Sequence, residues 1–304
     1  MLKKYQIENC RIIDGPNGAG TIWVYISPNE QEKKYLIDDL KIDEHTLASA
    51  LDPDELSRLE FEPDHAALIF KRPKNYSSQD ELLFKVSSVG IFLFKDRLIV
   101  VMPEETPLFE GKQFQRVASL NDLLLKLIYR SIFHYLEHLK IINMITDSLE
   151  DKISSSMENK YLLNLFTLEK SLVYYLNAIN SNSMLIEKLK TSAAKIGFSP
   201  EGLEFLDDII IENNQCYRQA EIYSNILASM MDARASIVSN NLNVLMKTLN
   251  IITIGIMVPT FVVSAFSMNV DIPLSWHPWA FWMVMGLALV SVVAFMFFWR
   301  FKKW

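Results

Sequence analysis

Eight side chains near the C-terminal end of the chain recur at alternating steps of three and four residues. They are Asn243, Met246, Asn250, Thr253, Met257, Thr260, Ser264 and Ser267. At 3.6 residues per turn these positions share one face of a helix, which therefore carries amide, hydroxyl and thioether groups. Neutral oxygen atoms of this kind suit a hard divalent cation that keeps much of its water. The face has no carboxylate or Cys, which argues against a Ca²⁺ cage and a soft-metal thiolate site.

The opposite side of the same helix is bulky and apolar. Its members are Ile251, Ile252, Ile256, Phe261, Val262 and Phe266. Small hydroxyl residues on a membrane helix also occur where two helices pack closely, so the polar face predicts either a helix–helix contact or the wall of a pore. A pore would need several subunits in a ring, because the two membrane helices of a single chain, described next, cannot enclose a water-filled path.

The polar face lies in the first of two long runs without a charged residue. Residues 248–270 and residues 272–299 contain no Asp, Glu, Lys or Arg, and each run exceeds the roughly 20 apolar residues needed to cross a bilayer. The segment Ser275-Trp-His-Pro-Trp between them carries aromatic residues typical of a membrane interface. We therefore predict a first transmembrane helix at 248–268, a loop at 269–278, a second transmembrane helix at 279–299 and a basic tail at 300–304.

Basic residues lie before the first run and after the second run, but not between the two runs. Lys247 precedes the first run, and Arg300, Lys302 and Lys303 follow the second, whereas the loop has Asp271 and no Lys or Arg. The positive-inside rule then predicts that both termini are cytoplasmic, in a protein of the cell inner or plasma membrane.

The charges of the chain are concentrated before residue 235. Residues 1–234 hold 61 of the 66 charged residues, with a net charge of −9, whereas residues 235–304 hold five. This distribution excludes a wholly soluble enzyme and argues against a nucleic-acid-binding protein, which would show a basic patch. Cys10 and Cys216 form no disulfide or metal-binding motif, and the N-terminus has no apolar signal segment, so the first 234 residues are predicted to be a reduced cytoplasmic part.

The cytoplasmic part changes character near residue 115. Residues 1–115 contain β-branched and aromatic runs at 21–27, 66–71, 85–94 and 98–102, with a helical segment at 43–51, and are predicted to be an α/β domain. Residues 116–247 have a strong break only at 197–202, which predicts a helical hairpin near 119–153 and 158–195 and then one very long stalk helix. At 1.5 Å per residue, a helix from Leu203 to Met268 would be roughly 100 Å long and continue into the membrane.

Specific motifs at the two ends of the first span resemble a known family. The span ends with Ala265-Phe-Ser-Met-Asn269, the polar face begins with Asn243-Val-Leu-Met246, Pro259 lies mid-span, and Lys-Lys-Trp closes the chain. This pattern resembles the CorA family of magnesium transporters, whose signature is Gly-Met-Asn at the outer end of the first span. The resemblance implies an N-terminal cytoplasmic α/β domain, a helical hairpin, a long stalk helix, two spans and a homopentamer.

The resemblance also implies roles for individual residues. Met268 and Asn269 match the last two signature positions, and the family's Asn forms a ring of amide oxygens at the outer mouth. The matches to the family's pore and gate positions are Asn243, Met246, Leu249 and Met257, with Asn250 as an alternative to Leu249. Asp271 matches an acidic loop position that would gather cations at the mouth. Ser267 replaces the signature Gly, so the identity of the preferred ion stays open.

Two further groups of side chains could bind metal. The family senses cytosolic Mg²⁺ through acidic side chains between subunits, and Asp208, with Asp207 beside it and Glu212 one turn on, falls at such a position. The alternative is an ordinary solvated acidic face. His134 and His138 are spaced to share a metal, but the sequence offers no third ligand, so a structural role is predicted for them.

Together these features predict a homo-oligomeric divalent-cation channel or transporter rather than an enzyme. The expected activity is passive uptake of Mg²⁺ driven by the membrane potential and gated by cytosolic Mg²⁺, with no organic cofactor. One alternative is a transporter or efflux protein for Zn²⁺ or a broader set of divalent ions including Co²⁺ and Ni²⁺. Another is a non-conducting metal sensor or scaffold anchored in the membrane. The expected partners are copies of the chain, the lipid bilayer and divalent cations.

Overall fold

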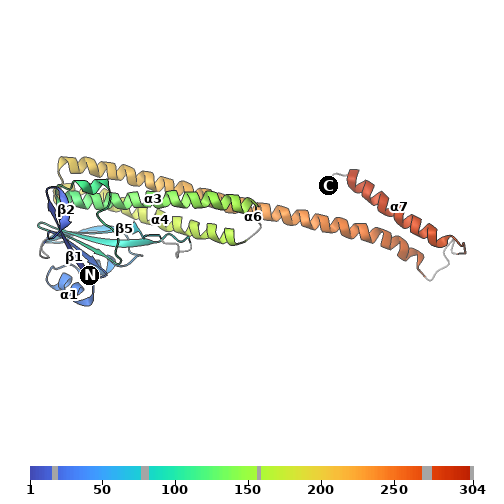
Figure 1. The fold of residues 1–304 in the computed structure, drawn as a ribbon, viewed down its shortest axis with the longest axis horizontal. Helices are drawn as coiled ribbons and strands as arrows, with labels where there is room; N and C mark the ends of the chain where they lie inside the picture. The colour runs from blue at the N-terminus through green and yellow to red at the C-terminus, as the bar shows by residue number, and fades with distance from the viewer. Residues whose placement is uncertain (16–19, 77–81, 156–158, 269–275, 302–304) are drawn as a thin grey trace. The chain divides into compact units, whose positions relative to one another are not determined.

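A computed structural model describes the chain except residues 16–19, 77–81, 156–158, 269–275 and 302–304 (Figure 1). The chain divides into two compact units, Met1–Met231 and Asp232–Trp304, and each is described by itself.

The first unit is built on a seven-stranded sheet. Its strands are β1 (Leu2–Glu8), β2 (Arg11–Asp14), β3 (Ile22–Ile26), β4 (Arg58–Phe61), β5 (His65–Pro73), β6 (Val86–Phe94) and β7 (Leu98–Met102). Their spatial order is β2-β1-β3-β7-β6-β5-β4. Neighbouring strands pair antiparallel, except that β3 and β7 run parallel with Ile22 opposite Leu98. The predicted α/β sheet domain is therefore confirmed.

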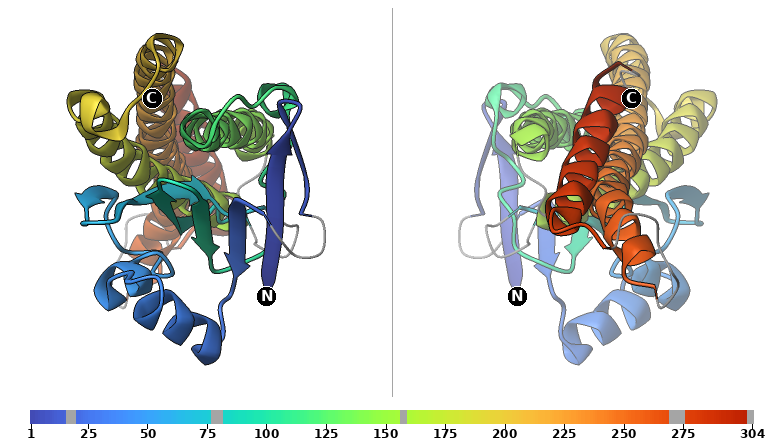
Figure 2. Two further views of the ribbon diagram at one scale, coloured as in Figure 1. Left: turned by 90° about the vertical axis from the view of Figure 1, so that its left-hand side faces the viewer. Right: turned by 90° about the vertical axis from the view of Figure 1, so that its right-hand side faces the viewer.

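Helices cover both faces of the sheet (Figure 2). Successive side chains of a strand point to opposite faces, so Ile69 and Ile99 join a core with the helices α1 (Glu30–Asp38) and α2 (Glu44–Ser49). Leu68 and Val100 join a second core with α3 (Leu120–Ser155) and α4 (Asn159–Thr191). The central strands are thus buried on both faces, which accounts for their continuous apolar sequences.

The helical layer formed by α3 and α4 also contains the start of the longest helix. After η3 (Lys112–Gln115) and the α3–α4 hairpin, a short helix α5 (Ala193–Ile196) ends at Gly197, whose φ of 79° suits Gly. Helix α6 (Pro200–Phe266) then runs for 67 residues. Within the first unit it packs on α4 through a hydrogen bond from Asn213 Nδ2 to Ser183 Oγ (2.6 Å), and on α3 through the rings of Phe205 and Tyr129 (centroids 5.3 Å apart).

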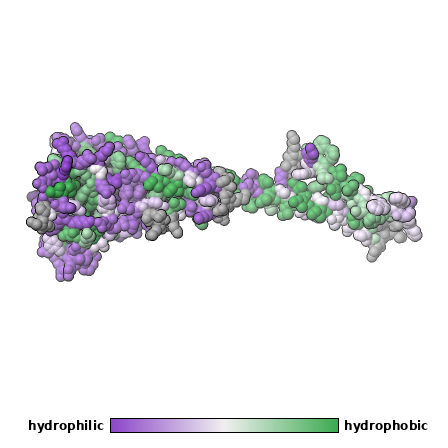
Figure 3. Space-filling model, viewed as in Figure 1, coloured by the Kyte–Doolittle hydropathy of each residue, from purple (hydrophilic) through white to green (hydrophobic). Residues whose placement is uncertain are grey.

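The second unit consists of the C-terminal part of α6 and helix α7 (Ala280–Phe301). Both helices are long and apolar enough to cross a membrane. Hydrophobic side chains cover much of the surface of this unit in Figure 3. The helical hairpin, the long stalk helix and the C-terminal apolar helix pair all agree with the predicted architecture.

Candidate functional site

The polar face of the first span is exposed in the single chain. Every one of its members from Asn243 to Ser267 lies at the surface, and the side chains of Met246 and Met257 are 62% and 63% exposed. Leu249, which the family resemblance also assigns to the pore, is 60% exposed and lies at the edge of this face. We call the eight residues the polar stripe.

Contacts within the second unit lie on a different side of α6. Its half-buried positions are Ile251, Gly255, Val258, Pro259 and Val262. They face a row of small or apolar residues on α7, of which Ala288 is buried and Phe295 is half-buried. A Cβ added to Gly255 would lie 3.5 Å from the Phe295 ring, an ordinary van der Waals contact, so this ring packs against α6 at Gly255. We call this contact the hairpin seam.

The polar stripe and the hairpin seam lie about half a turn apart on α6, or about 180° at 3.6 residues per turn. Helix α7 of the same chain therefore does not cover the stripe, and packing within the hairpin does not explain its small hydroxyl residues. Only part of the predicted apolar face is in the seam. Ile251 and Val262 are half-buried there, whereas Ile256 and Phe261 are 62% and 76% exposed because a single neighbouring helix covers only a narrow strip.

The threonine hydroxyl groups of the stripe bond to their own helix. Thr253 Oγ1 donates to the carbonyl of Leu249 (2.8 Å), and Thr260 Oγ1 donates to the carbonyl of Ile256 (2.7 Å). Each hydroxyl proton is thus used, and the oxygen lone pairs remain free to accept from water or to approach a cation. Thr253 and Thr260 therefore present acceptor oxygens at the surface of the helix.

Helix α6 ends at the altered signature. The backbone N–H of Ser267 bonds to the carbonyl of Ser264 (3.1 Å), as does the Ser267 hydroxyl (2.9 Å). Among the described residues with positive φ, Ser267 does not occur, so Ser occupies this turn without the strain that a left-handed conformation would impose. Met268 is 60% exposed. Asn269 and Asp271 lie outside the described residues.

The three predicted regulatory acids differ in their surroundings. Asp207 forms a salt bridge with Lys190 of α4 (2.6 Å), and both side chains are about half exposed. Asp208 is exposed and Glu212 is half-buried on the same side of α6, near Tyr129. Burial first, and then the charges of Glu212 and Asp208, raise the pKa of the Tyr129 hydroxyl. Asp208 and Glu212 are therefore neighbours, whereas Asp207 already has a partner.

The two spaced histidines are packed in the first unit. The Nδ1 atom of His138 lies 2.5 Å from the hydroxyl of the buried Tyr175. Burial lowers the pKa of His138 to about 4 and, with the nearby positive groups, that of His134 to about 3. Within the described ranges, no three His, Cys, Asp or Glu side chains are placed to hold one metal ion.

Comparison with known families decides the membership of the chain. Residues 18–303 match the family described as "CorA-like Mg2+ transporter protein". The chain belongs to this family. Its members are transporters, which supports the interpretation that the chain is not an enzyme, and its two apolar helices fit insertion in a membrane.

Individual relatives and solved structures are similar to this chain over almost its whole length. The "Cobalt/magnesium transport protein CorA" of Methanocaldococcus jannaschii is 26% identical over 299 residues, covering 93% of this chain and 91% of that protein. The complete structure of the CorA magnesium transporter from the same organism has a TM-score of 0.82 at 22% identity and covers 98% of this chain and 96% of that one. The full-length CmaX protein has a similar fold, with a TM-score of 0.75 at 14% identity, and covers 99% and 97% of the two chains.

Two features of this CorA-family chain escaped the sequence analysis. The hairpin seam was not predicted, although Gly255 in the first span and the small residues Ala288 and Ser291 in the second are the usual signal of close helix packing. The partner of Asp207, Lys190, was also missed, because the two residues belong to different helices of the hairpin layer.

Proposed function

We propose that this protein is a homopentameric channel that admits Mg²⁺ to the cytoplasm, with both termini on the cytoplasmic side. The observation that carries the proposal is the polar stripe, which is exposed in the single chain and lies opposite the hairpin seam in a member of a cation-transporter family. Copies arranged around an axis would bring their stripes together and give the stripe water and ions as neighbours.

The driving force needs no bound nucleotide. With about 100 mV across the membrane, inside negative, a divalent ion gains about 4.6 kcal/mol on entry, twice the value for a single charge. The lining would consist of neutral oxygen atoms and thioethers, against which Mg²⁺ can move with part of its hydration shell. The ring that selects the ion would be formed by Ser267, Met268 and Asn269, with Asp271 beside it.

Cysteine substitution tests whether the stripe lines the path. Thr253→Cys and Ile252→Cys lie at the same depth but face different ways, and each is made in a Cys10→Ser background because Cys10 is exposed and Cys216 is buried. We expect a charged thiol reagent to reduce Mg²⁺ uptake into proteoliposomes about 10-fold or more in Thr253→Cys, because the adduct enters the path, and by less than about twofold in Ile252→Cys. Equal effects at both positions would contradict the pore assignment.

Broader divalent transport is the second candidate. It is favoured by Ser267 in place of the signature Gly and by the relative whose name includes cobalt. Offering Mg²⁺, Zn²⁺, Co²⁺ and Ni²⁺ separately under an inside-negative potential distinguishes the two. Uptake of Mg²⁺ that exceeds the others supports the first candidate, and uptake of Zn²⁺ alone would replace it.

Gating by cytosolic Mg²⁺ would use Asp208 and Glu212. Their proximity within one chain supports this role, and a neighbouring subunit would supply the remaining ligands. We expect Asp208→Asn to raise the Mg²⁺ concentration that protects the protein from protease about 10-fold, since a carboxylate ligand is lost. Asp207→Asn is the matched control and should shift it by less than about twofold, because Asp207 pairs with Lys190. A larger shift in the control than in Asp208→Asn would refute the assignment.

A further inference from the structure

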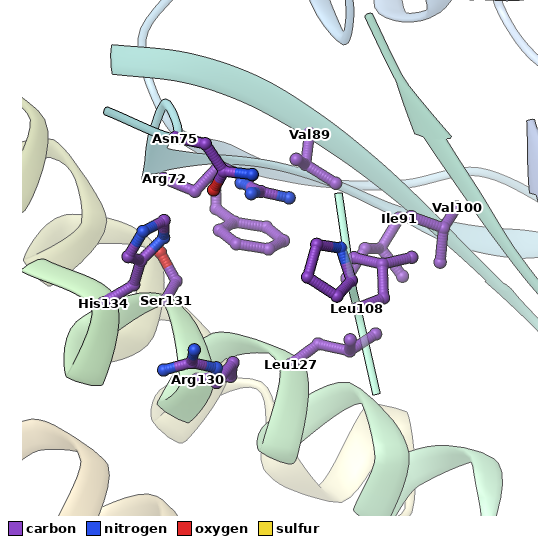
Figure 4. A pocket seen from close by; sticks show the side chains of 12 residues that line it. Arg72, Asn75, Val89, Ile91, Val100, Leu108, Leu127, Arg130, Ser131 and His134 are labelled. Atoms are coloured by element: carbon purple, nitrogen blue, oxygen red, sulfur yellow. The ribbon is translucent and has the colours of Figure 1, made fainter. Parts of the chain in front are cut away.

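A cavity of about 60 Å³ lies inside the first unit, between the sheet and α3 (Figure 4). Its floor is apolar and is formed by Val89 and Ile91 of β6, Val100 of β7 and Leu127 of α3. Its other side is polar. That side consists of Arg72, Asn75, Arg130, Ser131 and His134. A volume of this size accommodates about four water molecules or a ligand of similar bulk.

Arg72 has a half-buried positive charge beside this cavity. Its guanidinium donates to the hydroxyl of Thr106 and, over 3.4 Å, to the carbonyl of Pro73. Within the part of the chain that the structure describes, no carboxylate pairs with it. Glu104, the acid that most favours its charged form, is ion-paired with Lys74 (2.9 Å).

The pKa of Arg72 reflects this position. Burial lowers it to about 10, which shows that desolvation outweighs the nearby acids, yet the group stays charged at neutral pH. A charged group removed from water without a carboxylate partner leaves bonding capacity for an anion.

A second positive group, Arg130, lies on the polar side of the cavity. Arg130 of α3 is half-buried and pairs with Glu137 through Nη1 (3.0 Å). One turn along α3, burial lowers the pKa of His134, and His138 and the two arginines lower it further. A neutral imidazole has one N–H donor and one acceptor nitrogen, so it contributes a hydrogen bond but no charge. Figure 4 shows Arg72, Asn75, Ser131 and His134 grouped on the same side of the cavity.

We propose that this cavity binds a small organic carboxylate. The head group would lie between Arg72 and Arg130, since the planar guanidinium matches a carboxylate with two parallel hydrogen bonds. A methyl group on this carboxylate would lie against the apolar floor of the cavity. Inorganic phosphate fits this lining less well, because half of its oxygens would face apolar side chains without hydrogen-bond partners. The net charge of residues 1–234 is −9, which repels anions in general. An anion would therefore bind here only through direct contacts with Arg72 and Arg130.

The test is calorimetric titration of the purified full-length protein with sodium acetate, sodium butyrate, inorganic phosphate and ethylammonium chloride. We expect saturable binding of acetate at one site per chain, about 10-fold tighter than butyrate, because the two extra carbon atoms of butyrate exceed the volume of the cavity. Arg72→Met should weaken acetate binding about 10-fold or more, and Arg130→Gln several-fold.

Arg11→Gln is the matched control, because Arg11 is an exposed arginine of β2 outside the cavity. It should leave binding within about twofold of the wild type. Thermal unfolding of each variant shows whether the fold is retained, and Arg130→Gln keeps the test decisive if Arg72→Met unfolds. Undetectable acetate binding, equal or tighter binding of phosphate, or equal losses in Arg11→Gln and Arg130→Gln would overturn the proposal.

Discussion

Met257→Lys should abolish Mg²⁺ uptake while the protein still assembles in the membrane. Met257 lies at the middle of the polar stripe, between Thr253 and Thr260, and its side chain is 63% exposed in the single chain. In the proposed pentamer the new ammonium groups would form a ring around the path. A single positive charge about 5 Å from a divalent ion costs about 1.7 kcal/mol even at the dielectric constant of water. Several such charges should lower uptake about 100-fold or more.

The control for this substitution is Met257→Gln, which has similar length and no charge. It should transport within about threefold of the wild type, because a neutral amide fits the character of the stripe. Uptake is measured in proteoliposomes under an inside-negative potential, and size-exclusion chromatography in detergent confirms the oligomer. If Met257→Lys assembled normally and still transported at a rate near that of the wild type, the stripe would not line the path.

Asn269→Ala should reduce Mg²⁺ uptake about 10-fold or more, because each hydrogen bond to a charged or strongly polarised partner contributes about 1.5–3 kcal/mol and a ring of subunits loses several at once. Asn269 lies outside the described residues, and its role comes from the match of Ser267-Met-Asn269 to the family signature. Its two predecessors are exposed where α6 ends, in line with a position at the mouth of a pore.

Asn225→Ala is the companion variant, since Asn225 is an exposed amide of α6 far in sequence from the signature. Its uptake should match that of the wild type. The two variants are compared at several Mg²⁺ concentrations, so that weaker capture at the mouth is separated from slower passage. Unchanged uptake in Asn269→Ala would remove the mouth site and leave the stripe as the selective element.

The sequence predicted the strands and helices that have a strong periodic or apolar signal. The run at 98–102 coincides with β7, and the runs at 66–71 and 85–94 lie within one residue of β5 and β6 or inside them. These strands are buried on both faces, so their β-branched and aromatic residues are continuous. The long uninterrupted helix was predicted for the complementary reason that neither Gly nor Pro occurs between 203 and 254.

The elements that were missed have weaker signals. Strands β2 and β4 lie at the two edges of the sheet, where partial exposure permits charged residues such as Arg11 and Glu60. Helix α1 was also missed, although Asn29 and Glu32 form a capping box that the spacing of the two residues could have suggested.

The candidate site was predictable in its spacing but not in its surroundings. The steps of three and four residues placed the stripe on one face without any structure. Whether α7 covers that face depends on the hairpin seam, and no local pattern in α6 fixes which side of Gly255 meets Phe295. The pairing of Asp207 with Lys190 is likewise a tertiary contact between separate helices.

The threonine hydroxyls of the stripe also bear on which sign of charge can pass. Thr253 and Thr260 spend their protons on carbonyls of their own helix, so they present lone pairs and no donor to the path. A chloride ion needs donors to replace lost water, whereas a cation needs acceptors. At these two positions the wall therefore discriminates against anions without any fixed negative charge. Selection of cations over anions would then depend on the orientation of hydroxyl groups along the helix. The choice among different cations would be made separately, at the mouth.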